Sequence, residues 1–155
     1  MPSLKITRLS LVALALCASM MATSTPAIAQ TADPAQIIRD RRDGLKATGA
    51  HLEAIAAIGQ ARGDTRPAVE RVDAIIAFFA NFPDRFPANT QAGDTRALPA
   101  VFTDRAGFTT AWNNLSGPLA NLRTAAASGD NAAYSAALQQ VGPTCGACHR
   151  AYRSR

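Results

Sequence analysis

The sequence lacks an apolar run long enough to cross a membrane as a helix. Its longest uncharged apolar stretch, residues 9–21, is shorter than the ~20 residues that a span needs. Lys5 and Arg8 precede this stretch, and residues 27–29 form a small-x-small cleavage site, Ala-Ile-Ala. This layout is typical of a secretory signal peptide. We therefore predict that residues 1–29 are cleaved and that the rest of the chain is exported.

Cysteine is scarce, with three residues in the sequence. Cys17 lies in the predicted signal peptide, so the exported chain keeps Cys145 and Cys148 alone. Two thiols this close together do not remain free and unreacted in an oxidising compartment. They must be joined in a disulfide, bound to a metal or alkylated.

Clustered charge of one sign is missing too. The formal charge of +5 falls by two when Lys5 and Arg8 leave, and the remaining basic residues form no run. This gives little support for nucleic-acid binding. The sequence also shows no nucleophile–base pair and no paired carboxylate site, so we do not expect an enzyme. Strand-type alternation is absent, which leaves helical patterns.

Four segments carry helical periodicity. The first opens at Asp33 with a proline behind it and fades near residues 59–63; the others open near 64–67, near 103–104 and after the turn at 128–130. Their apolar stripes are Ile38, Leu45, Leu52 and Ile55; Val69, Val72, Ile76 and Phe79; Phe108, Trp112, Leu115, Leu119 and Leu122; and Tyr134, Leu138 and Val141. With one long crossover at 81–103, they predict a single all-α domain, residues 30–155, folded as an antiparallel four-helix bundle.

Two Gly-Pro pairs interrupt these patterns. Gly117-Pro118 predicts a kink in the third helix, or a later start of that helix. Gly142-Pro143 predicts an irregular turn, after which the fourth helix restarts just before Cys145.

The fourth stripe continues through Cys145, Cys148 and Tyr152, so a helix here points both sulfurs into the bundle. His149 follows the second cysteine and completes Cys-x-x-Cys-His, the attachment motif for c-type haem. In this chemistry the thiols add to the two vinyl groups of the porphyrin, and the histidine reaches the iron.

Three other uses of the cysteines stay open on the residues alone. Zinc normally takes four ligands, and the only other histidine, His51, is far away in sequence. A thioredoxin-type redox pair needs its first cysteine at a helix N-terminus, typically after a strand. A disulfide across two residues would stabilise little. Export and the lack of other cysteines favour haem.

The motif stands at the end of a predicted bundle and is followed by Tyr152-Arg153. In this respect the chain resembles cytochrome c′, the class II, four-helix-bundle family of c-type cytochromes. The similarity extends over the exported chain. The pattern Arg-x-x-x-Leu-Lys that starts at Arg41 resembles the family's first helix, and residues 92–96 resemble the segment before its third helix.

The resemblance implies one haem c, attached through Cys145 and Cys148, with His149 as the axial iron ligand. Arg153 matches a proximal arginine of the family, although it could equally be a frayed charged terminus.

The family also places basic side chains beside the haem propionates. This role is carried over to Arg41 and, less directly, to Arg42, where the family usually has glutamine. Asp94 matches a further haem-contacting position, but a plain turn residue is an equal alternative.

Leu45 matches the position that faces the distal side of the iron. Leucine has no donor atom, and the methionines at positions 20 and 21 leave with the signal peptide. We therefore expect a five-coordinate, high-spin iron that binds NO and CO but binds O₂ poorly. His51 is expected at the surface. The alternative is a six-coordinate, low-spin carrier of the cytochrome c-556 type, in which relatives place methionine at this position.

Two roles follow from a haem of this kind: electron transfer with an unidentified redox partner, and binding of small gases in the periplasm. Members of the family are commonly homodimers through the first two helices. A haem-free thiol redox protein is a third, weaker reading.

Overall fold

The computed structural model describes residues 33–155, so the predicted signal peptide lies outside the described residues. This part of the chain is helical apart from turns, loops and an isolated antiparallel bridge between Ala97 and Arg153. No helix within it is long and apolar enough to span a membrane. The elements are α1 (Pro34–Ala61), α2 (Ala68–Phe79), η1 (Phe82–Arg85), η2 (Ala88–Thr90), α3 (Ala100–Thr103), α4 (Arg105–Asn113), α5 (Ser116–Ser128) and α6 (Asn131–Tyr152).

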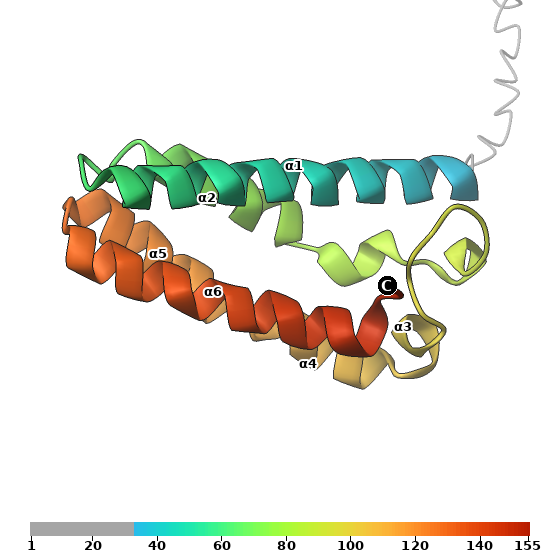
Figure 1. Ribbon diagram of the computed structural model, residues 1–155. Coiled ribbons are helices and arrows are strands. Elements are labelled where there is room, and N and C mark those ends of the chain that lie inside the picture. Colours follow the sequence, from blue (N-terminus) through green and yellow to red (C-terminus); the bar gives the residue numbers. More distant parts are fainter. Residues whose placement is uncertain (1–32) are drawn as a thin grey trace, which may run out of the picture. The chain divides into compact units, whose positions relative to one another are not determined.

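The long helices form the predicted bundle (Figure 1). α1 packs against α2, α2 against α5, and α5 against α6, while α1 and α4 also contact α6. The two short elements η1 and η2 and the four-residue α3 belong to the long crossover. The all-α four-helix-bundle prediction is confirmed, with the third helix divided into α4 and α5.

Local capping explains where α1 begins and ends. The Asp33 carboxylate accepts a hydrogen bond from the Ala35 N–H at 3.1 Å, and Pro34 occupies the first helical position, as the sequence predicts. At the other end Arg62 adopts a left-handed conformation with φ of 51°, and its N–H bonds to the Gly59 carbonyl. The helix therefore stops within the predicted range.

The third helix breaks near its Gly-Pro pair. α4 ends at Asn113 and α5 begins at Ser116, which places Pro118 in the first turn of α5. The missing N–H of a proline costs no helical hydrogen bond in a first turn. The prediction of a kink or a later start is thus confirmed, with the break just before Gly117.

The predicted irregular turn at Gly142-Pro143 is wrong. α6 runs from Asn131 to Tyr152 with Pro143 inside it. Proline in a helix interior costs about 3 kcal/mol, mostly through the lost hydrogen bond and a clash with the carbonyl one turn earlier. That carbonyl belongs to Gln139 on the exposed side of α6, where water can solvate it. Buried residues on either side, Val141 and Tyr152, hold the helix on its neighbours.

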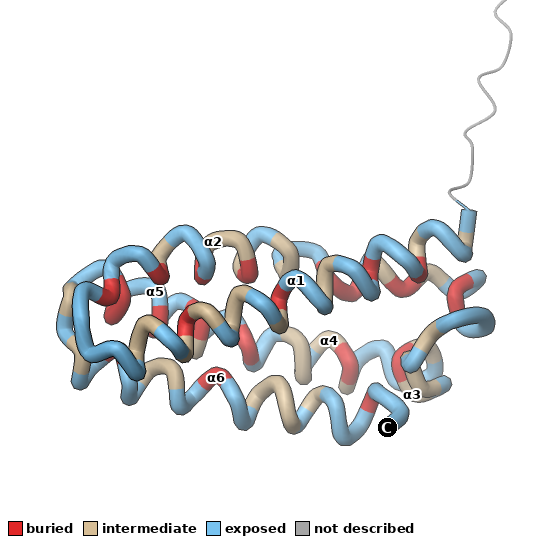
Figure 2. Tube along the Cα trace, turned by 45° about the horizontal axis from the view of Figure 1, so that its top comes forward, coloured by how far each residue is buried: buried red, intermediate tan, exposed pale blue. Residues whose placement is uncertain are grey.

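Buried residues, red in Figure 2, lie on the inner sides of the helices. Their side chains form two clusters. The main cluster joins α1, α2, α5 and α6 and contains Tyr134, whose hydroxyl donates to the buried Ile55 carbonyl at 2.7 Å. The aromatic cluster joins the crossover, α4 and the end of α6; its buried members are Phe82, Phe86, Val101, Phe108 and Tyr152. The candidate site lies where the two clusters meet.

Gly44 sets the close approach of α1 and α2. A Cβ atom at this position would overlap the ring of Phe78. The phenyl ring therefore packs directly on the α1 backbone, and a residue other than glycine cannot be accommodated without movement of the ring.

Candidate cofactor site

A cavity of about 620 Å³ opens between α1, α4, α6 and the crossover. Its volume lies within the range of roughly 300–1,000 Å³ that is usual for ligand and cofactor sites. Cys145, Cys148 and His149 lie on its α6 side, and Leu45 lies on its α1 side. The structure therefore brings together residues that are about a hundred positions apart in sequence.

The two cysteines face different parts of the core. Cys145 packs against the main cluster and Cys148 against the aromatic cluster. Both are free thiols. Burial raises the pKa of each thiol, because it penalises the thiolate, and the neighbouring Cys145 raises that of Cys148 further. The continuous α6 thus presents both sulfurs to one cavity.

His149 lies at the exposed edge of the same cavity. Partial burial of the ring and the charge of Arg153 lower the pKa of His149. The lowered pKa favours the neutral imidazole, which is the form that can bind a metal. Arg153 also lines the cavity.

Arg41 is the most deeply buried charged residue of the described chain, with 2 % of its surface exposed. Its guanidinium donates to the Arg85 carbonyl at 3.0 Å and to the hydroxyls of Thr90 at 3.3 Å and Thr95 at 2.8 Å. It also lies 4.1 Å above the Phe86 ring. Burial lowers its pKa.

All hydrogen-bond partners of Arg41 within residues 33–155 are uncharged. A buried cation without an anion is costly. Since Arg41 also lines the cavity, a ligand carboxylate in the cavity would supply the missing charge.

Arg42 lines the cavity as well, but its guanidinium forms an ion pair with Asp94. It also donates to the Asp94 backbone carbonyl at 3.1 Å. Asp94 is exposed and does not line the cavity. Asp94 can therefore act on a cofactor only indirectly, by positioning the Arg42 guanidinium.

Leu45, Thr48 and Trp112 offer the cavity no free hydrogen-bond donor. Leu45 is half-buried against the aromatic cluster. The hydroxyl of Thr48 donates to the Gly44 carbonyl at 2.9 Å, and the indole N–H of Trp112 donates to the Phe79 carbonyl at 2.8 Å. With these groups already satisfied, the part of the wall that Leu45, Thr48 and Trp112 form is apolar, whereas Arg41, Arg42 and Lys46 also line the cavity and carry charge.

The sequence did not reveal how the end of α6 is held. The Tyr152 hydroxyl donates to Asp104 Oδ2 at 2.8 Å, and the other oxygen of Asp104 accepts from the Gly107 N–H at the start of α4. Asp104 was predicted as a helix start, but its partner Tyr152 lies 48 residues away. The Leu98 N–H also donates to the Tyr152 carbonyl at 3.0 Å. These contacts fix the turn that carries His149.

His51 lies elsewhere. It lines a second hollow, of about 640 Å³, together with Arg66, Pro67, Glu70 and Arg71. This hollow contains no thiol, and His51 is not among the residues around Cys145 and Cys148.

The donor set fits haem c better than the alternatives. Within the described chain, no three His, Cys, Asp or Glu side chains gather as possible metal ligands, which speaks against zinc. Two thiols and an imidazole on one helical turn, an apolar wall and a buried arginine without an anion match a flat apolar group with acidic substituents.

Comparison with known proteins agrees with this geometry. A sequence profile described as Cytochrome C′ matches residues 36–153. The chain belongs to the cytochrome c′ family. Its cofactor is therefore covalently attached haem c, and Cys145 and Cys148 are present near the C-terminus.

Individual cytochromes c′ match over nearly their whole length. The cytochrome c′ of Rhodospirillum rubrum is 31% identical over 139 residues, which cover 88% of this chain and 95% of that protein. A cytochrome c-556 of Agrobacterium tumefaciens is 34% identical, over 74% of this chain and 94% of its own. The crystal structure of cytochrome c′ from Rubrivivax gelatinosus has a TM-score of 0.72 and 27% identity, and covers 81% of this chain and 100% of its own.

Proposed function

We propose that this cytochrome c′ is a periplasmic haem protein with five-coordinate, high-spin iron that transfers single electrons, binds small diatomic gases, or does both. Cys145 and Cys148 form the thioethers, and His149 is the axial ligand. The observation that carries the proposal is the cavity itself: it has the attachment motif on one wall and Leu45, which has no donor atom, on the other. Bound haem supplies a one-electron couple and an open coordination position.

The chain's own residues select what reaches that position. Leu45, Thr48 and Trp112 present carbon atoms and donors that are already satisfied. Such a wall disfavours water and anions, which need hydrogen bonds or counter-charges. Small uncharged diatomics need neither. A solved relative supports NO as a candidate ligand: cytochrome c prime from Alcaligenes xylosoxidans, 25% identical with a TM-score of 0.72, is known as a nitric oxide complex of a leucine-to-isoleucine variant.

The other charged residues hold the edge of the cofactor. Arg41 and Arg42 both line the cavity, where they can meet acidic substituents of the cofactor, and Arg42 is also paired with Asp94. Arg153, next to His149 in the cavity lining, is assigned to the proximal face.

The visible spectrum of the haem-loaded protein tests the proposal. The dithionite-reduced form should lack a sharp, split α/β pair, and its Soret band should shift strongly on addition of CO. If the reduced spectrum is sharp and does not change with CO, the iron is six-coordinate and the proposal of an open site is wrong. If the protein acquires no Soret band when made with haem-attachment machinery, the assignment of Cys145 and Cys148 is wrong.

The similarity to cytochrome c-556 keeps the low-spin electron carrier as the second candidate. The same spectrum decides between them, since that alternative requires a sixth ligand. Leu45 offers none, and the structure places His51 outside the cavity.

A further inference from the structure

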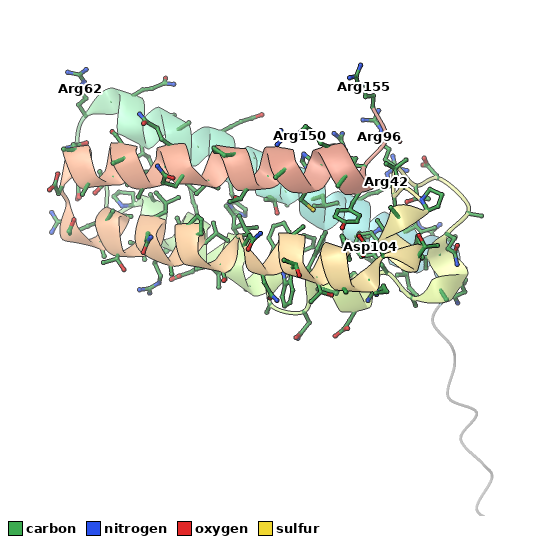
Figure 3. The ribbon with its side chains drawn as sticks, turned by 90° about the horizontal axis from the view of Figure 1, so that it is seen from below. Arg42, Arg62, Arg96, Asp104, Arg150 and Arg155 are labelled. Atoms are coloured by element: carbon green, nitrogen blue, oxygen red, sulfur yellow. The ribbon has the colours of Figure 1, made fainter. Side chains whose placement is uncertain are left out.

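Five basic residues surround the end of α6 at the mouth of the cavity. This basic patch is defined as Lys46, Arg96, Arg150, Arg153 and Arg155, all of which are exposed. Three of them, Lys46, Arg96 and Arg153, line the cavity itself. Figure 3 shows Arg96, Arg150 and Arg155 together at this end of the molecule and Arg62 at the opposite end.

The backbone holds the patch together although its members are distant in sequence. The Ser154 N–H donates to the Arg96 carbonyl at 2.9 Å, and Ala97 pairs with Arg153. Arg150 lies one helical turn before Arg153 on the last turns of α6. The loop before α3 and the chain end therefore present their charges on one surface.

These cations have no carboxylate partners among residues 33–155. Elsewhere in the fold arginines do find them: Arg39 pairs with Asp33, Arg66 with Asp64 and Arg123 with Asp73. Residues 131–155 contain no Asp or Glu at all, and Asp43 is the one acidic residue that lines the cavity. Like charges gathered without counter-charges repel one another, so an external anionic partner would stabilise the patch.

We infer that the basic patch docks an acidic face of a redox partner protein over the mouth of the cavity. This inference rests on the proposed electron-transfer role. Complementary charge would steer the partner to the surface where the cofactor edge is closest, and would make association fast and salt-dependent.

A protein fits this surface better than a nucleic acid or a membrane. No Phe, Tyr or Trp side chain in residues 33–155 is exposed, so the patch has none of these rings to stack on bases or to enter a bilayer interface. Three of the five cations, Lys46, Arg96 and Arg153, line one cavity.

The test compares two double variants of the haem-loaded protein that change the net charge equally. Arg150→Glu with Arg155→Glu alters the patch outside the cavity lining. Arg62→Glu with Arg71→Glu alters exposed arginines away from the cavity, which also have no ion pair in the described structure. A dye-labelled hexaglutamate peptide serves as the acidic probe, and binding is measured by fluorescence anisotropy from low to physiological salt.

We expect the patch variant to bind the peptide about tenfold more weakly and the control variant less than about twofold more weakly, with the difference shrinking as salt screens the charges beyond ~8 Å. Equal weakening in both variants would show that net charge alone acts and would overturn the inference. Tighter binding of a DNA duplex or of phosphatidylserine vesicles than of the peptide would overturn the choice of a protein partner. The CO-induced Soret shift, recorded on the same samples, reports separately on the proposed function.

Discussion

At the scale of single residues, Arg41 stands out because it is a buried cation whose hydrogen-bond partners are all uncharged. It is a charged side chain on the inner stripe of α1, held by three neutral oxygens from the crossover. The guanidinium thus has two tasks, since it fastens residues 85–95 to α1 and brings positive charge to the cavity. Its hydrogen bonds to the crossover fasten residues 85–95 to α1. The need for positive charge in the cavity explains why a charged residue is kept at this buried position.

Replacing Arg41 by glutamine should lower the free energy of unfolding by about 2 kcal/mol, because buried acceptors lose their donors. Urea unfolding of the haem-loaded protein, followed by circular dichroism, measures the change. Arg39→Gln, on the exposed side of the same helix, is the control and should change stability by less than ~0.5 kcal/mol. Equal effects in both variants would mean that the buried contacts contribute little.

Leu45→Met should convert the iron to a six-coordinate, low-spin form, because it places a thioether on the distal wall. The reduced spectrum should sharpen into split α and β bands, and the CO-induced shift should diminish. Leu52→Met, two helical turns further along α1 and also in the cavity lining, is the matched control. If the Leu45→Met variant stays high-spin, the assignment of Leu45 to the distal side of the iron is wrong.

At the scale of elements, contacts between helices decide features that local patterns cannot. The start of α1 was predictable because the cap and the proline are adjacent in sequence. The continuity of α6 through Pro143 was not predictable, because packing on both sides of the proline outweighs its local cost. The contact of Tyr152 with Asp104 likewise depends on the fold, although both residues belonged to predicted helices.

Tyr152→Phe should lower the thermal midpoint at neutral pH, because it removes the donor to Asp104. The hydrogen bond to the carboxylate raises the pKa of Tyr152 above its ordinary value of 10.0. A raised pKa in the folded state means that the stabilisation is complete below pH 10 and is lost as the pH rises through the folded-state pKa. The midpoint difference between the two proteins should therefore be constant from pH 6 to about 9 and shrink above about 10.

Thermal melts across this range measure that difference. Burial also raises the pKa of Tyr134. Tyr134 is present in both proteins, so its ionisation does not affect the difference between their thermal midpoints. A difference that stays constant to high pH would show that the hydroxyl acts through packing and not through the carboxylate.

Gly44→Ala should destabilise the contact between α1 and α2 by about 1–3 kcal/mol, because the new methyl group would overlap the Phe78 ring. Gly146→Ala, within α6, brings only the flexible end of the Arg150 side chain within 4 Å of the new atom, and it should instead stabilise the helix by up to about 1 kcal/mol. Chemical unfolding of both variants gives the two signs. A stabilised Gly44 variant would show that α1 and α2 are further apart than described.

At the scale of the whole molecule, the described domain has one end packed by the main cluster and another that surrounds the cavity. Sequence patterns predicted the bundle and the attachment motif, because periodicity and spacing are local. They did not predict the neutral partners of Arg41 or the grouping of the basic patch, which bring together residues from α1, the crossover and α6.

Removing the cofactor should loosen these two ends unequally. In a Cys145→Ala, Cys148→Ala protein, amides of α2 and α5 should stay protected, since their contacts lie in the main cluster. Amides of η1 and α3 should exchange much faster than in the haem-loaded protein, because their cluster borders the cavity. Hydrogen exchange read by mass spectrometry measures both, and uniform loss of protection would contradict a division of the core.

The sequence contains a single tryptophan, and Trp112 lies in the cavity wall with its indole N–H bound to the Phe79 carbonyl. Haem absorbs light in the region where indole emits, so a filled cavity should leave the folded protein almost dark in ultraviolet-excited fluorescence. Emission should return as the chain unfolds and the ring moves away from the porphyrin. The fluorescence of Trp112 is therefore an intrinsic probe of folding in the haem-loaded protein, and no added dye is needed.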